Sequence, residues 1–199
     1  ADGNNIRFGL MAIKNLGLGL IERLISEREK NGKYTSMYDF CIRNYSREFN
    51  RKALEGLIKS GALDLLEDNR RQMLYNIEGV LSFVENERRF SSEGQLNLFD
   101  EMGEAHEYIP EKMPEMDNDL KLALEKEATG LYLSGHPMDK YSNLYNNPNF
   151  TLISQILAGK LSDGMRVTIA GIISNLKVRQ LKNNSLLASA LIEDVTGTV

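Results

Sequence analysis

The chain has 199 residues, of which 42% are hydrophobic and 26% charged, and its net charge is −4. This composition is typical of a soluble globular protein with one large domain or two small ones. No apolar run approaches a membrane span and no signal peptide opens the chain, so we expect a cytoplasmic protein without a membrane partner. Cys41 is the only cysteine, which excludes an internal disulfide, and we expect it in the core.

Charge is distributed unevenly along the chain. Residues 1–60 contain 11 Lys and Arg against 7 Asp and Glu, whereas residues 61–130 contain 7 against 17. A basic N-terminal third in an acidic chain favours a local contact with DNA over general polyanion binding.

The first predicted element is a helical hairpin whose turn reads Ile-Lys-Asn-Leu-Gly-Leu-Gly over residues 13–19. Asn15 and Gly17 tolerate positive φ, and the following helix offers free N–H groups and the positive end of its dipole. This is the pattern of a helix-hairpin-helix, which holds a DNA phosphate without reading base sequence. The alternative is an ordinary helical hairpin with glycines for packing. The predicted contacts to duplex phosphate are Lys14, Asn15, Leu16, Gly17, Leu18 and Gly19.

A second hairpin follows at a second glycine turn. Ser36 is predicted to cap one short helix and Asn50 to cap another, which ends at Ser60 and Gly61. The repeat predicts a tandem helix-hairpin-helix domain over residues 1–90, with Lys59, Ser60 and Gly61 as further contacts to duplex DNA. Asn69 is predicted to cap a longer helix that runs to about Phe90.

Residues 91–118 are acidic and contain prolines, so we expect a linker with little fixed structure. This linker contains Gln-Leu-Asn-Leu-Phe at residues 95–99, which resembles the pentapeptide that binds the bacterial replicative sliding clamp. The alternative is that these apolar residues pack back on the helical domain. The predicted clamp contacts are Gln95, Leu96, Leu98 and Phe99.

The rest of the chain divides into a helical connector over residues 119–148 and a β-rich part over 149–199. In the connector, one helix is predicted to end before Gly130, and a short one to run from Pro137 towards Tyr145. A strand over residues 166–175, with Gly171 as a bend or bulge, and a second over 186–194 suggest the start of an OB-type barrel. The expected fold is therefore mainly α followed by a truncated β domain, α+β overall.

Basic residues near the predicted strands are candidate contacts to single-stranded DNA: Lys177, Arg179 and Lys182. No aromatic residue follows Phe150 to provide a stacking platform, so strand-edge charges that discourage edge pairing are an equal alternative. No spaced carboxylates, Walker loop or zinc ligands are found, and we predict no catalytic residue, metal or cofactor in this segment.

Four stretches together resemble the bacterial DNA polymerase III alpha subunit: Ile6–Leu10, Ala12–Gly17, Leu54–Asp64 and Leu124–Pro137. The resemblance covers nearly the whole chain, which we expect to be a segment of a longer protein. It departs from the family at Asn15, where a glycine is usual. Asparagine tolerates the left-handed region, so we expect the turn to survive.

The resemblance implies a non-catalytic segment of a DNA-directed DNA polymerase, a nucleotidyltransferase of DNA replication. The helix-hairpin-helix pair would grip duplex DNA, the pentapeptide would tether the polymerase to the beta sliding clamp, and the OB domain would lie near single-stranded template. Other replisome subunits would be partners of the parent. The catalytic aspartates and their Mg²⁺ belong to a palm domain that no part of this chain matches.

Two hypotheses from other classes remain open. A clamp-associated repair nuclease or glycosylase would share the hairpin and the peptide, but it needs a catalytic acid or lysine for which the sequence offers no candidate. A helical scaffold without a DNA role would bind neither duplex nor clamp.

Overall fold

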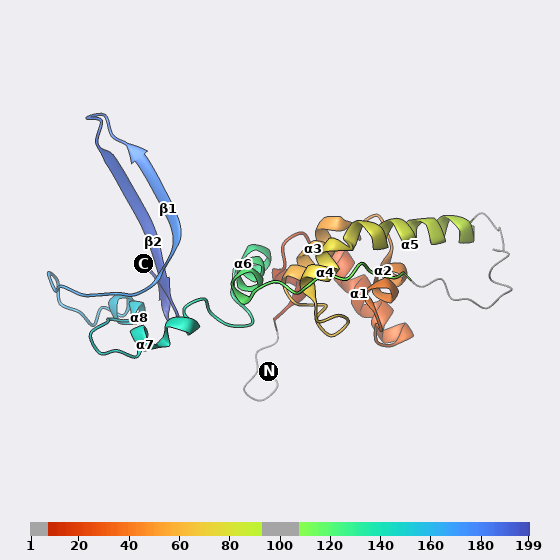
Figure 1. The fold of residues 1–199 in the computed structure, drawn as a ribbon, viewed down its shortest axis with the longest axis horizontal. Helices are drawn as coiled ribbons and strands as arrows, with labels where there is room; N and C mark the ends of the chain where they lie inside the picture. Colours follow the sequence, from red (N-terminus) through yellow and green to blue (C-terminus); the bar gives the residue numbers. More distant parts are fainter. Residues whose placement is uncertain (1–7, 93–107) are drawn as a thin grey trace. The chain divides into compact units, whose positions relative to one another are not determined.

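The computed structural model describes residues 8–92 and 108–199, which divide into two compact units at Leu133 and Ser134. The described residues contain eight α-helices and one three-stranded antiparallel sheet, so the prediction of a mainly helical α+β fold is confirmed (Figure 1). A membrane-spanning length of apolar helix is not found in the described part of the chain.

The first unit is helical. It starts with a single 3-10 turn, where the sequence predicted a full first helix of the hairpin. The elements are η1 (Leu10–Ala12), α1 (Leu18–Asn31), α2 (Met37–Asn44), α3 (Arg51–Lys59), α4 (Arg70–Tyr75), α5 (Ile77–Ser92) and α6 (Asn118–Thr129).

Three predicted helix caps are confirmed. The side chains of Ser36, Asn50 and Asn69 each accept a hydrogen bond from the backbone N–H three residues later, at 3.0, 3.1 and 2.8 Å. Each bond satisfies one of the N–H groups that a helix leaves without a partner at its start.

The core of this unit lies between the helices. Cys41 is fully buried there, as predicted, and burial raises the pKa of its thiol to about 12, so the side chain behaves as a small apolar group. The completely buried core side chains include Cys41, Ala53, Leu54, Ile58, Val80 and Val84.

The predicted long helix after Asn69 is interrupted at Asn76, between α4 and α5. Asn76 is buried, and its side-chain amide donates to the carbonyl oxygens of Gln72 (2.8 Å) and Glu111 (2.9 Å). Its side-chain oxygen accepts from the hydroxyl of Tyr108 (2.9 Å) and from the N–H of Glu111 (2.8 Å). Asparagine side chains compete with the helix for backbone hydrogen bonds. Here the helix is interrupted at Asn76, and its side chain binds a segment that is distant in sequence.

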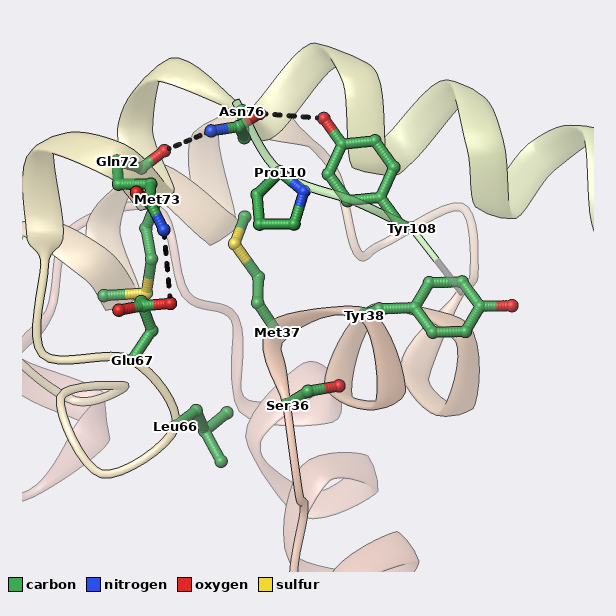
Figure 2. A pocket seen from close by; sticks show the side chains of 10 residues that line it. All are labelled: Ser36, Met37, Tyr38, Leu66, Glu67, Gln72, Met73, Asn76, Tyr108 and Pro110. Atoms are coloured by element: carbon green, nitrogen blue, oxygen red, sulfur yellow. Dashed lines mark hydrogen bonds between the residues drawn. The ribbon is translucent and has the colours of Figure 1, made fainter. Parts of the chain in front are cut away.

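That distant segment, residues 108–117, was expected to have little fixed structure, and this expectation is wrong. It is extended and lies along α4, with Tyr108 and Pro110 lining a cavity of about 190 Å³ beside Met37 and Met73 (Figure 2). Further along, Asn69 donates to the Met113 carbonyl at 2.6 Å. We call residues 108–117 the strap, because hydrogen bonds between its backbone and the side chains of Asn69 and Asn76 fix it to the helices.

A buried ion network joins the strap's continuation, α6, to the second hairpin. Arg70 binds Asp64 through two hydrogen bonds (2.8 and 2.7 Å) and Glu125 of α6 through a third (2.9 Å). The side chains of Arg70 and Glu125 are 5% and 0% exposed. Burial alone would lower the pKa of Arg70, but hydrogen bonds to Asp64 and Glu125 raise it, so the guanidinium stays charged.

The second unit contains short helices and a β-ribbon. Its elements are η3 (Asp139–Tyr141), α7 (Ser142–Tyr145), α8 (Ile153–Leu157), β1 (Ile172–Gln180), β2 (Leu186–Asp194) and β3 (Gly197–Thr198). The order in the sheet is β1-β2-β3, antiparallel throughout.

The first strand starts later than predicted, at Ile172 instead of Arg166, because its partner β2 ends at Asp194 and offers nothing to pair with earlier residues. The bulge lies between Ile173 and Asn175, not at Gly171. Gly171 permits a close approach instead: a Cβ there would stand 2.6 Å from the side chain of Ile192.

Asp194 ties the second unit together. Its carboxylate is 4% exposed and accepts from the N–H of Ile153 (2.8 Å), of Gly197 (3.0 Å), and from both N–H and hydroxyl of Thr196 (2.7 and 2.6 Å). Burial alone would raise the pKa of Asp194, but these hydrogen bonds lower it below its usual value.

We predict that Arg70→Leu lowers the free energy of unfolding of the first unit by about 3–5 kcal/mol, because it leaves Glu125 buried without its cation. Arg51→Leu is the matched control, since Arg51 pairs with Glu55 and Glu78 on the surface and its loss should cost less than about 1 kcal/mol. Urea unfolding followed by circular dichroism measures both. Equal losses in the two variants would contradict the role given to Arg70.

We also predict that Asp194→Ala destabilises the second unit by about 1–3 kcal/mol, because several donors lose their acceptor. Asp163→Ala, at an exposed position, should have no such effect. Since the folded pKa of Asp194 is lowered, its contribution is complete above the unfolded value of about 3.9 and is lost as the pH falls below it. Amide exchange at Ile153 and Gly197 measures the change; unaltered protection in Asp194→Ala would contradict it.

Candidate nucleic-acid interface

The sequence predicts a positive φ at Asn15 and Gly17 in the turn of the first hairpin, and the structure has it at Asn15 only. Asn15 adopts φ 66°, in the left-handed region, so the turn survives with asparagine in place of the glycine usual in the resembled family. Gly17 has φ −79° and ψ 153°, an extended conformation open to any residue, so the prediction of a special backbone there is wrong. The space around Gly17 is open, because a Cβ placed there would meet no atom within 4 Å.

No side chain caps the start of α1, where the sequence predicts an anion site. Gly17 is the N-cap residue of α1 and has no side chain that could accept a hydrogen bond from the first turn. The first intrahelical bond runs from the N–H of Ile21 to the Gly17 carbonyl (3.2 Å), so the N–H groups before Ile21 have no partner within the helix. Leu18 and Gly19 are exposed, whereas Leu16 is half-buried. Exposed N–H groups and the helix dipole together suit an oxyanion.

A carboxylate that the sequence pattern did not indicate lies at this helix start. The Glu48 Oε2 would be 3.4 Å from a Cβ placed on Gly19. Glu48 stands 29 positions after Gly19, at a spacing with no local periodicity, so only the packing of α1 against the loop before α3 brings the two together.

Lys14 does not lie at the start of α1, where the sequence placed it. Its N–H donates to the Ala128 carbonyl (2.9 Å) and its Nζ to the Glu127 carbonyl (2.6 Å), both at the C-terminal end of α6. A cation at this end complements the helix dipole. Lys14 therefore fixes the turn to α6.

The second glycine turn serves packing. Ser60 is 7% exposed and its hydroxyl donates to the Leu57 carbonyl (3.0 Å). Gly61 has φ 77°, and a Cβ there would stand 2.3 Å from an Arg70 nitrogen. Lys59 forms an ion pair with Glu127 (2.9 Å). Ser60 and Gly61 are therefore used in packing, whereas Lys59 pairs with Glu127, whose side chain is 61% exposed.

The structure places the candidate single-strand contacts on the β-ribbon. Lys177 and Arg179 are two positions apart on β1 and therefore lie on one face. Their partners on β2, Ser189 and Leu187, lie on the same face, and Leu187 is 46% exposed. The opposite face carries Leu176 and Val178, both more than half exposed. Lys182 lies in the turn between β1 and β2.

The predicted clamp contacts Gln95, Leu96, Leu98 and Phe99 lie outside the described residues. In residues 8–92 and 108–199, no group of three His, Cys, Asp or Glu side chains is arranged to hold a metal ion.

Known proteins are similar to the chain over its N-terminal hairpins and over nearly all of its residues. Residues 1–73 match the family described as "Helix-hairpin-helix motif". The DNA polymerase III subunit alpha of Borreliella burgdorferi is 36% identical over an alignment of 203 residues. This alignment covers 98% of this chain and 17% of the relative. The subunits of Mycobacterium tuberculosis and Buchnera aphidicola are 34% and 31% identical over 99% and 97% of the chain, again 17% of each relative.

The chain thus spans 17% of the length of these curated relatives. The similarity covers the helical unit and the β-ribbon, and it confirms the resemblance inferred from the four sequence stretches. The chain is homologous to one segment of the DNA polymerase III alpha subunit and carries a helix-hairpin-helix motif at its start.

Proposed function

We propose that this chain is the duplex-binding and clamp-binding segment of a bacterial replicative DNA polymerase. The observation that carries the first part is the open start of α1, where Gly17 leaves first-turn N–H groups accessible beside the left-handed Asn15 turn. The match to the helix-hairpin-helix family over the same residues supports it. In this proposal the backbone amides near Leu18 and Gly19 hold a DNA phosphate, and base sequence is not read.

We assign no catalytic step to the segment. DNA-directed nucleotidyl transfer, with its Mg²⁺, belongs in this proposal to another part of the homologous polymerase, and the segment itself needs no cofactor. Its role is to hold the duplex product while other replisome subunits act, in the cytoplasm.

The clamp contact rests on Gln95, Leu98 and Phe99. A glutamine followed by two apolar anchors at this spacing suits an apolar pocket with one polar group, as short recognition peptides use. The strap that follows starts at Tyr108 and is fixed to α4, so a clamp bound at 95–99 would be connected to the hairpin unit by only a few residues. This short tether supports a role in processive synthesis.

A contact between the β-ribbon and single-stranded template is a further part of the proposal. Lys177 and Arg179 share one face of the ribbon with Leu187, and the opposite face, which carries Leu176 and Val178, suits the interior of an OB-type barrel. A clamp-associated repair enzyme is the alternative, and primer extension by the full-length parent separates the two.

We predict that duplex binding is independent of sequence and that log affinity falls with log salt at a slope of roughly −3 to −4, as for three to five neutralised phosphates. Fluorescence anisotropy with two duplexes of unrelated sequence measures this. Salt-independent binding or a strong sequence preference would contradict the phosphate contact.

Gly17→Val should weaken duplex binding by about tenfold or more while the fold is retained, because a side chain fits the extended backbone but blocks the approach to the first-turn amides. Gly9→Val is the matched control: Gly9 has φ −79° and ψ 137°, and a Cβ there also meets nothing within 4 Å. Equal affinities of the two variants would exclude this site.

Replacing both Leu98 and Phe99 by alanine should abolish binding to the sliding clamp, since these side chains are the two apolar anchors of the peptide. Asn97→Ala, at a spacer position, should bind normally. Surface plasmon resonance with immobilised clamp measures binding, and thermal unfolding tests the alternative that the two residues pack on the helical unit. A large loss of thermal stability in the double variant would support that alternative.

A further inference from the structure

The turn of the first hairpin, α3 and α6 together enclose a cavity that is separate from the start of α1. Its volume is about 330 Å³. Lys14 and Asn15 line it from the turn, Lys52, Glu55 and Lys59 from α3, and Glu127 from α6. All three elements belong to the first unit.

Basic side chains outnumber acidic ones in this cavity, with three lysines and two glutamates in its lining. Of its two acidic residues, Glu55 is bound by Arg51 at 2.7 Å, and the same arginine also pairs with Glu78. Lys52 and Lys59 are seven residues apart on α3, so both lie on the same side of the helix, about two turns apart. Their ammonium groups reach the cavity from both ends of α3.

The remaining acid, Glu127, shows that an oxyanion fits this position. Its carboxylate is 2.9 Å from the Lys59 Nζ. The Glu127 side chain is 61% exposed and that of Lys59 only 21%, so the carboxylate can move into water while the lysine stays in place. An exposed pair of this kind contributes little to stability and is open to competition by another anion.

The cavity is close to the proposed phosphate contact at α1. Asn15 lines the cavity and lies two residues before the cap residue Gly17, so at most about 7 Å of chain separates the two. A DNA strand with one phosphate at the start of α1 therefore brings a neighbouring phosphate to the lysines.

We propose that this cavity is a second phosphate site for the same DNA strand, in which Lys52 and Lys59 bind the phosphate and the Glu127 carboxylate occupies its place when DNA is absent. This inference rests on the proposed duplex binding and adds a site to it. Lys14 keeps the turn attached to α6 through the Glu127 and Ala128 carbonyls, and Glu127 needs to move only its side chain to admit the phosphate.

The test is duplex affinity of the whole chain at several salt concentrations, measured by fluorescence anisotropy with a labelled duplex. Glu127→Gln should bind about two- to fivefold more tightly, because the competing charge is gone and the loss of an exposed pair leaves the fold intact. Lys52→Gln and Lys59→Gln should each bind more weakly and lower the salt slope by about one.

Two control variants make the same changes of charge at positions that do not line the cavity. Glu29→Gln, near the far end of α1, should gain less than Glu127→Gln, and Lys160→Gln, in the second unit, should lose less than either lysine variant. Adding Glu127→Gln to Lys59→Gln should give a smaller gain than in the parent chain, since the two residues are coupled.

The inference is overturned if the lysine variants match Lys160→Gln, or if Glu127→Gln matches Glu29→Gln. If Gly17→Val loses binding while all cavity variants bind like the parent chain, the second site fails and the proposed function stands. If the parent chain does not bind duplex at all, both fail together.

Discussion

The buried guanidinium of Arg70 joins parts of the first unit that are distant in sequence. It binds Asp64 at the end of the second hairpin and Glu125 on α6, and it fills the space left open by Gly61. A charge with so little exposure is stable only while its carboxylates remain in place. The second glycine turn, which reads as a DNA contact in the sequence, is therefore used to pack an arginine.

Because α6 is fixed at Glu125, its C-terminal carbonyls are held against the first hairpin. Lys14 binds two of these carbonyls, and the left-handed residue Asn15 follows directly. The hairpin turn is thus supported from outside by a helix more than 100 positions later in the chain. Pre-positioned backbone amides lose little conformational entropy when they bind an anion, which suits the proposed phosphate contact.

A carboxylate lies near each of the two proposed phosphate sites. Glu48 lies beside the first turn of α1, and Glu127 pairs with Lys59 in the neighbouring cavity. Carboxylates at these positions satisfy local positive charge in the free protein. In the proposed function they would also compete with the phosphate and so moderate the affinity for DNA.

The sequence by itself determined the local elements, because their causes are local. The caps at Ser36, Asn50 and Asn69 and the left-handed Asn15 follow from residue chemistry within a few positions. Only the tertiary structure decided the break at Asn76, the fixed strap, the packing role of Gly61 and the partners of Lys14 and Lys59. Each depends on groups 35 or more residues away, or on a buried charge, and periodicity carries no information about such contacts.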